Sequence, residues 1–214
     1  MILTVSHQKG GVGKSTIAWN LAVYFSKMLP TKIIDLDTQQ SLTQTNQIRK
    51  SVDLEPLDII SFNSADDLTA YIEKDSTKTL TIIDSGGFDS SFNRIAISGS
   101  DLLLTPVSDK PFDLMGLQKY EEILKALSGI QGELIQTNVI FNDINPSMRN
   151  FQDLEAFILQ SEHFNLMTSI LRQRVDISSS IGVGKSIKEF RVFSKADQEF
   201  DALFEEVKQK LNIV

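Results

Sequence analysis

Residues 9–16 read KGGVGKST, and this segment has the residue types and spacing best suited to chemistry. Gly10, Gly11 and Gly13 allow backbone N–H groups to turn toward an anion, because no Cβ stands in the way. A β-rich run precedes the segment and a helical pattern follows it, so the positive end of a helix dipole adds to the loop. The segment is therefore predicted to bind phosphate groups.

The other residues of this loop indicate which phosphates it binds. Lys14 is expected to reach the β- and γ-phosphates of ATP, and the Ser15 hydroxyl to ligate Mg²⁺. Val12 lies within the backbone cradle, and Thr16 is expected next to the α-phosphate. ATP and Mg²⁺ are thus the predicted cofactors.

The loop departs from the common P-loop pattern in one position. The residue five places before Gly13, where the common pattern has glycine, is Gln8, and Lys9 stands instead directly before two glycines. This is the deviant form of the P-loop. The letters GVGKS recur at residues 182–186, but no strand pattern precedes them there, and we interpret this second copy as a coincidence in a surface loop.

Acidic side chains close the second predicted strand. Asp35 and Asp37 end the run KIIDLD, and their period-two spacing predicts that both point to the same side of the sheet. Two carboxylates at a sheet edge repel each other unless a cation or a water network lies there. We assign Asp37 to orienting the attacking water or a Mg²⁺-bound water, and Asp35 to support. A carboxylate that only caps a loop is the alternative.

Two further strand ends carry polar side chains. Asp84 ends the run LTIID, the form expected of a second magnesium-binding motif, and the glycines Gly86 and Gly87 after it permit a loop that senses the γ-phosphate. The predicted magnesium ligands are therefore Ser15, Asp37 and Asp84. Asn142 ends the run TNVIFN, and its amide can donate to and accept from adenine, or can serve the turn that follows.

The elements that position these residues follow from the alternation of apolar runs with helical patterns. Strands are expected at residues 2–6, 32–37, 57–62, 79–84, 101–107, 136–142 and 166–171, and helices at residues 15–27, 65–74, 88–97, 112–127, 148–161 and 195–211. This order is typical of a three-layer α/β fold, a mostly parallel twisted sheet with helices on both faces. Ligands bind such sheets at the carboxyl ends of the strands.

A length of 214 residues predicts one P-loop domain, residues 1–214.

Composition excludes several classes of site. The chain has no cysteine, which excludes disulfides, Fe–S clusters and thiolate metal sites. No apolar run approaches the roughly 18 residues of a membrane span, and no basic segment precedes the first apolar run, so a cytoplasmic protein is expected. The net charge of −7 argues against a protein whose whole surface is basic and binds nucleic acid.

One stretch, residues 172–195, is nevertheless basic. It holds six basic and two acidic residues, a net charge of +4, whereas the rest of the chain carries −11. Its candidate DNA-binding residues are Arg172, Lys185, Lys188 and Arg191. The alternative interpretation is that this basic stretch is an ordinary solvent-exposed surface with no binding role.

With these residues in hand, the chain resembles the ParA/MinD family of deviant P-loop ATPases, and most of all the small partition ATPases of plasmids and chromosomes. KGGVGKST is the signature of that family. DLDTQQS at residues 35–41 and IIDSGG at residues 82–87 resemble its two switch segments, although Thr38 stands where proline is usual. DLLLTPVSDKPFDLMGL at residues 101–117 and GKSIKEF at residues 184–190 are similar to later family segments.

The resemblance implies a Mg²⁺-dependent ATPase that forms a homodimer with ATP. It implies three catalytic residues, Lys9, Lys14 and Asp37, with Lys9 crossing to the phosphates of the partner subunit. The dimer would bind DNA without sequence preference, which places it on the nucleoid in the ATP state. A ParB-like centromere-binding protein would stimulate hydrolysis.

Two alternatives share the P-loop. One is a family member that positions another cargo or assists DNA transfer, which the sequence barely separates from partition. The other is a membrane-associated MinD-like ATPase, which needs a cationic amphipathic C-terminal helix. The chain ends FDALFEEVKQKLNIV, with mixed charges, so no stable membrane association is expected.

Overall fold

The computed structural model describes residues 1–74 and 78–213, and strands alternate with helices through almost all of this part of the chain. The strands are β1 (Ile2–Val5), β2 (Thr31–Asp35), β3 (Asp58–Ile60), β4 (Leu80–Asp84), β5 (Leu102–Val107), β6 (Thr137–Ile144) and β7 (Phe164–Arg172). The helices are α1 (Lys14–Phe25), α2 (Ser41–Ser51), α3 (Ala65–Ile72), α4 (Ser91–Ser98), α5 (Pro111–Gln131), α6 (Gln152–Leu159), α7 (Val175–Gly182), α8 (Ile187–Phe190) and α9 (Lys195–Lys210).

The strands form one seven-stranded sheet in the order β3-β2-β4-β1-β5-β6-β7. Every neighbouring pair is parallel, so the predicted α/β fold is confirmed. The register aligns the carboxyl ends of the three strands that carry the predicted motifs. Val5 lies beside Asp84, and Asp84 lies beside Asp35. The loop after β1 and two of the predicted carboxylates therefore emerge at one level of the sheet.

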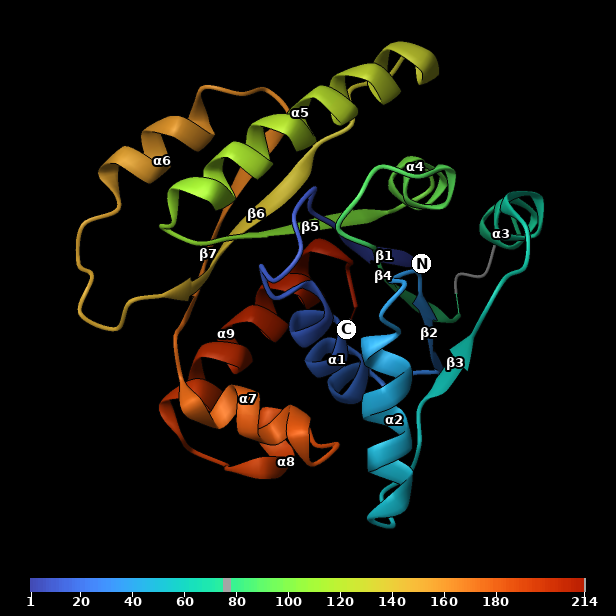
Figure 1. Cartoon of the computed structure of the whole chain (residues 1–214), viewed down its shortest axis with the longest axis vertical. Helices are drawn as coiled ribbons and strands as arrows, with labels where there is room; N and C mark the ends of the chain where they lie inside the picture. The colour runs from blue at the N-terminus through green and yellow to red at the C-terminus, as the bar shows by residue number, and fades with distance from the viewer. Residues whose placement is uncertain (75–77, 214) are drawn as a thin grey trace.

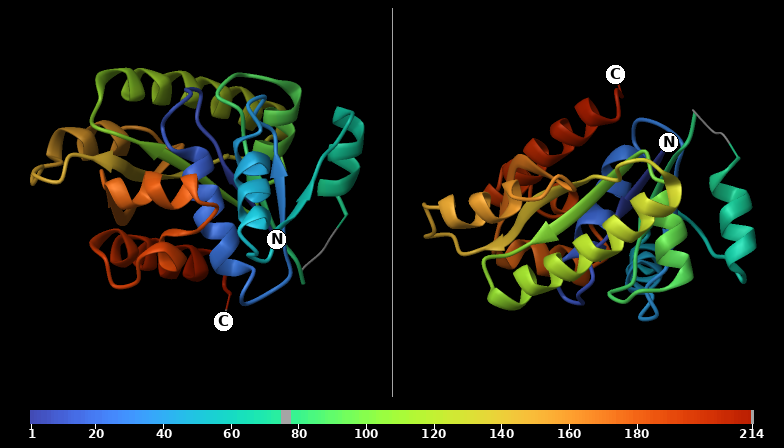
Figure 2. Two further views of the ribbon diagram at one scale, coloured as in Figure 1. Left: turned by 60° about the horizontal axis from the view of Figure 1, so that its bottom comes forward. Right: turned by 90° about the horizontal axis from the view of Figure 1, so that it is seen from above.

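Helices cover both faces of the sheet (Figures 1 and 2). One face is covered by α1 and α9, with α2, α7 and α8 beside them, and the other by α3, α4, α5 and α6. Strand side chains alternate between these layers. In β5, Leu102 and Leu104 pack in the cluster of α1 and α9, whereas Leu103 and Val107 pack against α5. Both faces are thus buried, as the apolar strands predict.

Three helices, α2, α7 and the four-residue α8, were not expected from the sequence. The α2 sequence SLTQTNQIRKS is almost entirely polar and buries few residues, so it lacks an apolar stripe from which a helix is recognised. Several boundaries also differ, among them the end of α5, which lies at Gln131 rather than at residue 127. The α4 helix begins at Ser91 because Ser90 caps it, α6 begins at Gln152 rather than at residue 148, and β3 is only three residues long.

The second GVGKS segment is a surface loop only in part, because Gly182 and Val183 are exposed but the residues after them pack inward. It joins α7 to α8, and Gly184 and Ser186 within it are buried. Gly184 has a φ of +69°, and a Cβ there would come within 2.4 Å of the Arg49 backbone nitrogen. The glycine is therefore required for this loop to pack against α2, and the motif has a structural role.

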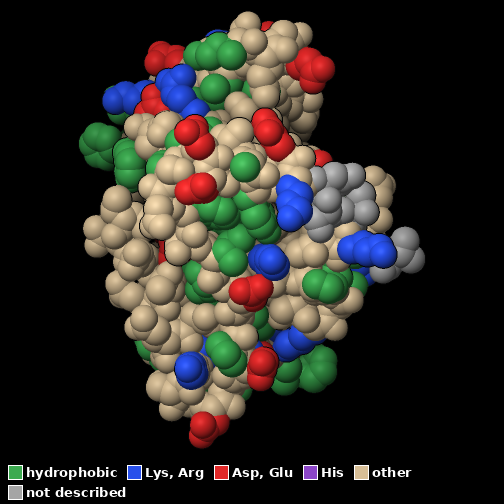
Figure 3. Space-filling view, turned by 90° about the vertical axis from the view of Figure 1, so that its right-hand side faces the viewer, with side chains coloured by type: hydrophobic (Ala, Val, Ile, Leu, Met, Phe, Trp, Pro, Cys, Tyr) green, Lys and Arg blue, Asp and Glu red, His purple; other side chains and the backbone are tan. Residues whose placement is uncertain are grey.

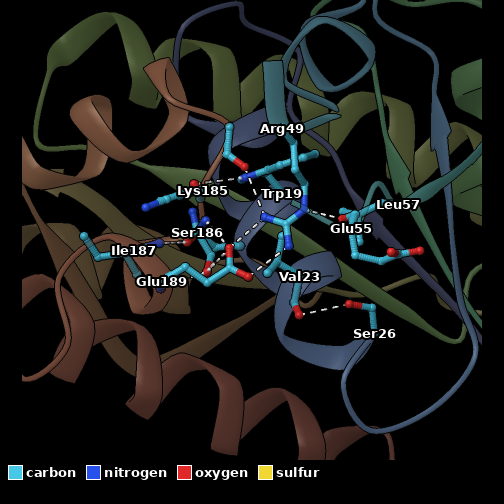
Figure 4. Close-up of polar contacts among 12 residues, drawn as sticks. Trp19, Val23, Ser26, Arg49, Glu55, Leu57, Lys185, Ser186, Ile187 and Glu189 are labelled. Atoms are coloured by element: carbon cyan, nitrogen blue, oxygen red, sulfur yellow. Dashed lines mark hydrogen bonds and ion pairs between the residues drawn. The ribbon is translucent and has the colours of Figure 1, made fainter. Parts of the chain in front are cut away.

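Arg49, at the end of α2, is the centre of the polar contacts that hold this packing together (Figure 4). Its guanidinium forms two hydrogen bonds with the Glu189 carboxylate, at 2.7 and 2.9 Å, and donates to the carbonyls of Gly184 and Glu55. The Trp19 ring lies 6.0 Å from the guanidinium, and its indole N–H donates to the Lys185 carbonyl at 3.1 Å. The bidentate pair thus joins α2 to α8, and Trp19 adds the contacts from α1.

This pair makes stability depend on pH in a predictable direction. Burial alone raises the pKa of Glu189, but hydrogen bonds from Arg49 and the Ser186 backbone outweigh it and lower the pKa to about 2. The contribution is present above the ordinary glutamate pKa and is lost as pH falls toward 2. Glu189→Gln should reduce the free energy of unfolding by about 2–3 kcal/mol at neutral pH. Urea unfolding across this pH range should show the difference from wild type shrinking as pH falls.

Glu122→Gln is the matched control, because Glu122 is exposed on α5. It should change the free energy of unfolding by less than about 0.5 kcal/mol at any pH. A Glu189→Gln variant with the same pH dependence as wild type would contradict the assigned role of the ion pair.

Candidate nucleotide-binding site

The glycine-rich loop joins β1 to α1 and takes the shape that its glycines predict. Gly11 and Gly13 have φ values of +79° and +95°, in the left-handed region where side chains are disfavoured. Gly13 is the N-cap of α1, and its carbonyl accepts the first helical hydrogen bond, from the Ile17 N–H at 3.0 Å. The helix N-terminus therefore points into the loop, which favours an anion there.

Lys14 is buried inside this loop, with only 4% of its surface exposed. Its ammonium donates to the Lys9 carbonyl at 2.9 Å, across the width of the loop. Burial lowers the pKa of Lys14, while the carboxylates of Asp84 and Asp37 act in the opposite direction. A buried ammonium with so few acceptors is well suited to bind an anion that enters the loop.

Asp84 is completely buried at the end of β4. Within the described residues, neither of its carboxylate oxygens accepts a hydrogen bond. Burial raises the pKa of Asp84 to about 7, an effect that the Ser15 hydroxyl and Lys14 partly oppose. The buried carboxylate and the Ser15 hydroxyl beside it offer the hard oxygen ligands that magnesium prefers, so the residues present fit that ion.

The segment after β2 holds the other predicted carboxylates. Asp35 is the last residue of the strand, and its carboxylate accepts hydrogen bonds from the N–H and the hydroxyl of Thr43, both at 3.0 Å. Asp35 therefore fixes the start of α2 to the sheet. Asp37 lies beyond the strand rather than within it, and it accepts from the Gln39 N–H at 2.9 Å.

These elements enclose a cavity of about 470 Å³. Its walls are the glycine-rich loop, Asp37 and Gln39 after β2, and Gly87 and Phe88 after β4. Gly87 lies so close to the loop that a Cβ there would come within 2.8 Å of the Gly10 nitrogen. The structure therefore brings both predicted switch segments against the phosphate loop.

Asn142 lies on the other side of the glycine-rich loop. Its amide donates to the Val12 carbonyl at 2.7 Å, so it supports the loop directly. A second cavity, of about 530 Å³, opens beside it and is lined by Asn142, Thr16 and the start of α7, including Val175 and Ile177. A flat apolar ring could enter between the loop and α7. The adenine contact assigned to Asn142 stays a prediction.

Lys9 is held within its own subunit. It forms an ion pair with Asp113 at the start of α5, and Asp113 also accepts from the Ser108 hydroxyl. Burial raises the pKa of Asp113, but these two hydrogen bonds bring it below its usual value. The Lys9 N–H donates to Nδ1 of His7, whose pKa falls to about 4, chiefly through burial and then through Lys14. His7 is therefore a neutral acceptor.

Sequence reasoning did not single out Asp113, although it lies in the quoted segment at residues 101–117. Its partner Lys9 is 104 positions away, so no local spacing links them. The only available signal was an acidic residue in the first turn of a helix, which is common.

The predicted DNA-binding residues do not form one free basic surface. Arg172 lines the cavity beside Asn142 and donates to the carbonyls of Asn145 and Met148. Lys188 pairs with Asp201, and Arg191 with Asp176. Lys185 forms no ion pair within the described residues. The positions of these side chains do not test whether they contact DNA, so their assignment as DNA-binding residues stays a prediction.

A third cavity, of about 480 Å³, lies at the opposite, amino-terminal ends of the strands. Lys32, Tyr71 and Asp101 are among its lining residues, and it includes no residue of the glycine-rich loop. On the side of the molecule that carries α3, Lys, Arg, Asp and Glu side chains are interspersed (Figure 3). No large area of one charge is visible on this side.

The glycine-rich loop at the exit of β1, the buried lysine and the strand-end carboxylates define a P-loop nucleotide-binding protein. The model of the CobQ/CobB/MinD/ParA nucleotide binding domain matches residues 3–187. The chain belongs to this family, and the resemblance inferred from the sequence is confirmed.

Individual relatives are distant but span most of the chain. The virulence plasmid ParA family protein pGP5-D of Chlamydia psittaci is 22% identical, over 95% of this chain and 92% of its own length. A putative plasmid partition protein of Borrelia burgdorferi bound to AMPPNP has a TM-score of 0.70 at 18% identity, covering 98% of each chain. The ATP complex of a McdA variant from Cyanothece has a TM-score of 0.76 at 18% identity, covering 100% of this chain and 96% of its own. The fold is that of the ParA/MinD ATPases.

The glycine-rich loop can be tested at the glycine with the least room. A Cβ at Gly13 would come within 2.2 Å of the Asn142 amide nitrogen, and the φ of +95° adds strain. Gly13→Ala should therefore weaken ATP binding by at least about 100-fold, because the loop must reshape. Isothermal titration calorimetry with ATP and Mg²⁺ measures this.

Gly129→Ala is the matched control, because a Cβ at Gly129, within α5, meets nothing within 4 Å. It should bind ATP like the wild type and unfold at the same or a higher temperature. Equal ATP affinity in the two variants would show that the loop does not bind the nucleotide.

Proposed function

We propose that residues 1–214 form one ParA-type ATPase domain that hydrolyses ATP with Mg²⁺ and acts in partition of a plasmid or chromosome. One observation carries this proposal: a buried lysine and a buried carboxylate without hydrogen-bond donors meet at the glycine-rich loop. Lys14 requires an anion and Asp84 a cation, and a triphosphate with Mg²⁺ supplies both. The low-identity relatives named as ParA and plasmid partition proteins support the biological role.

The chemistry is transfer of the γ-phosphoryl group to water, in which positioning and charge stabilisation dominate. Residues 10–16 hold the phosphates through backbone N–H groups, and Lys14 neutralises charge on the β- and γ-phosphates. Ser15, Asp37 and Asp84 would hold Mg²⁺, which supplies further positive charge at the phosphates. Asp37, at the wall of the phosphate cavity, orients the attacking water. Asn142 and the start of α7 hold the adenine.

Dimer formation with ATP accounts for Lys9. In the single chain its ammonium is paired with Asp113 and is partly exposed, at the edge of the phosphate loop. Release from Asp113 would free it to contact the phosphates of a partner subunit. Phe112 and Met115 are exposed beside Lys9 and give this edge apolar surface for a homodimer contact.

The ATP-bound dimer is proposed to bind DNA without sequence preference through Lys185, Lys188, Arg191 and Arg172, and a ParB-like protein to stimulate its hydrolysis. The location is then cytoplasmic, with nucleoid association in the ATP state. One observation supports the absence of stable membrane association. The apolar face of α9 is buried against the sheet through Phe200, Leu203 and Phe204, so it is not free to contact lipid. None of the helices in residues 1–74 and 78–213 combines the length and apolar character that a bilayer-spanning helix requires.

Two variants distinguish the roles assigned to Lys14 and Asp37. Lys14→Ala should abolish ATP binding and ATP-driven dimer formation, because the buried cation is lost. Asp37→Ala should retain ATP binding but lower the turnover rate by about 100-fold and accumulate the dimer, because the water is no longer oriented. Calorimetry, phosphate release and light scattering measure these steps. Rapid turnover by Asp37→Ala would remove that residue from its role, and absence of ATP binding by the wild type would overturn the proposal.

The proposed DNA contacts can be tested by salt dependence. Lys185→Ala combined with Lys188→Ala should weaken binding to unrelated DNA sequences equally, and should reduce the slope of log affinity against log salt by about 2. Lys210→Ala, in the last turn of α9, is the control for removal of a charge elsewhere. DNA retention by the double variant equal to that of the wild type, in ATP, would place the DNA surface elsewhere.

A further inference from the structure

The loop after β4 lines the phosphate cavity with backbone N–H groups that form no hydrogen bond within the described residues. Gly87 and Phe88 both line that cavity, and Gly87 lies against the Gly10 backbone. The Gly87 N–H makes no hydrogen bond within the part of the chain that the structure describes, whereas the N–H groups of Ser85 and Gly86 are both bonded. A free donor at this place is suited to a phosphate oxygen.

A buried amide, Asn93, sets the conformation of this loop. Its Oδ1 accepts from the Gly86 N–H at 3.2 Å, and its Nδ2 donates to the carbonyls of Gly86 at 3.3 Å and Phe88 at 2.5 Å. These bonds hold the residues on both sides of Gly87 and leave Gly87 itself unbonded. Asn93 is only 4% exposed, so its amide has little access to water as an alternative partner.

Asn93 is itself held in place by the start of α4. Ser90 is the N-cap of this helix, and its hydroxyl accepts from the Asn93 N–H at 3.1 Å. Asp89, in the same turn, forms two hydrogen bonds with Arg94, both at 2.7 Å. The amide therefore projects from a fixed helix end onto the loop, and loop and helix position each other.

We propose that Asn93 is a positioning residue, which presents the Gly87 N–H to the γ-phosphate and so makes the site distinguish ATP from ADP. The inference rests on the proposed ATPase function. It predicts a selective effect, because ADP lacks the phosphate that the Gly87 N–H would contact. Loss of Asn93 should weaken ATP binding and slow hydrolysis while ADP affinity stays nearly constant.

Asn93→Asp tests this with almost no change in side-chain size. The aspartate keeps the acceptor for the Gly86 N–H but loses both donors and places negative charge against two carbonyls. The ratio of ATP to ADP affinity, measured by calorimetry with a slowly hydrolysed ATP analogue and with ADP, should fall by about tenfold. ADP affinity itself should stay within about twofold of wild type.

Asn138→Asp is the matched control for a buried asparagine. Asn138 lies near the amino-terminal end of β6 and lines none of the three cavities described above, and its Nδ2 donates to the Leu103 carbonyl at 3.1 Å. Both variants lose a buried hydrogen bond, but only Asn93→Asp should change the ATP to ADP ratio. Equal ratios in wild type and both variants would overturn the positioning role.

A milder pair of variants covers the case in which Asn93→Asp fails to fold. Ser90→Ala removes the cap that holds Asn93, and Ser64→Ala removes the equivalent cap of α3, which accepts from the Asp67 N–H at 3.1 Å. Both should lower stability to a similar extent, but Ser90→Ala alone should reduce the ATP to ADP ratio, by about threefold. An unchanged ratio in Ser90→Ala counts against the proposal. A wild-type protein that binds neither nucleotide overturns the ATPase function instead, so the two failures are distinct.

Discussion

The site depends on one electrostatic constraint, two ionisable groups of opposite charge buried together at the exit of the central strands. Lys14 and Asp84 are both removed from water, and burial shifts the pKa of each toward its neutral form. Each group offsets part of the cost for the other, yet neither has the full set of partners that a buried charge requires. The fold therefore leaves a buried cationic group and a buried anionic group short of partners at the same point.

The parallel sheet satisfies this constraint through register. β1 and β4 are neighbours, so the loop after Val5 and the carboxylate of Asp84 leave the sheet side by side. β2 brings Asp35 to the same level, where it ties the start of α2 to the sheet. The two segments that border the phosphate cavity thus begin at fixed strand ends.

Contacts outside the site keep the surrounding helices in place. The Arg49–Glu189 pair fastens α2 to α8 at the end of α2 away from the cavity, with Trp19 of α1 beside the guanidinium. Gly184 allows the connecting loop to approach α2. The repeated GVGKS letters therefore serve two different ends, a phosphate loop after a strand and a packing loop between helices, because the neighbouring elements differ.

The sequence by itself determined the parallel α/β fold, the glycine-rich loop, and the strand ends that carry Asp35 and Asp84, whereas the strand of Asn142 continues to Ile144. These features follow from local periodicity and short motifs. Only the tertiary structure decided which partners meet, as in the pairs Lys9–Asp113 and Arg49–Glu189 and the clamp of Asn93 on the second switch loop. The pairs Lys9–Asp113 and Arg49–Glu189 each join residues that lie more than 100 positions apart in the sequence. Such partners depend on how layers pack, and no local spacing encodes that.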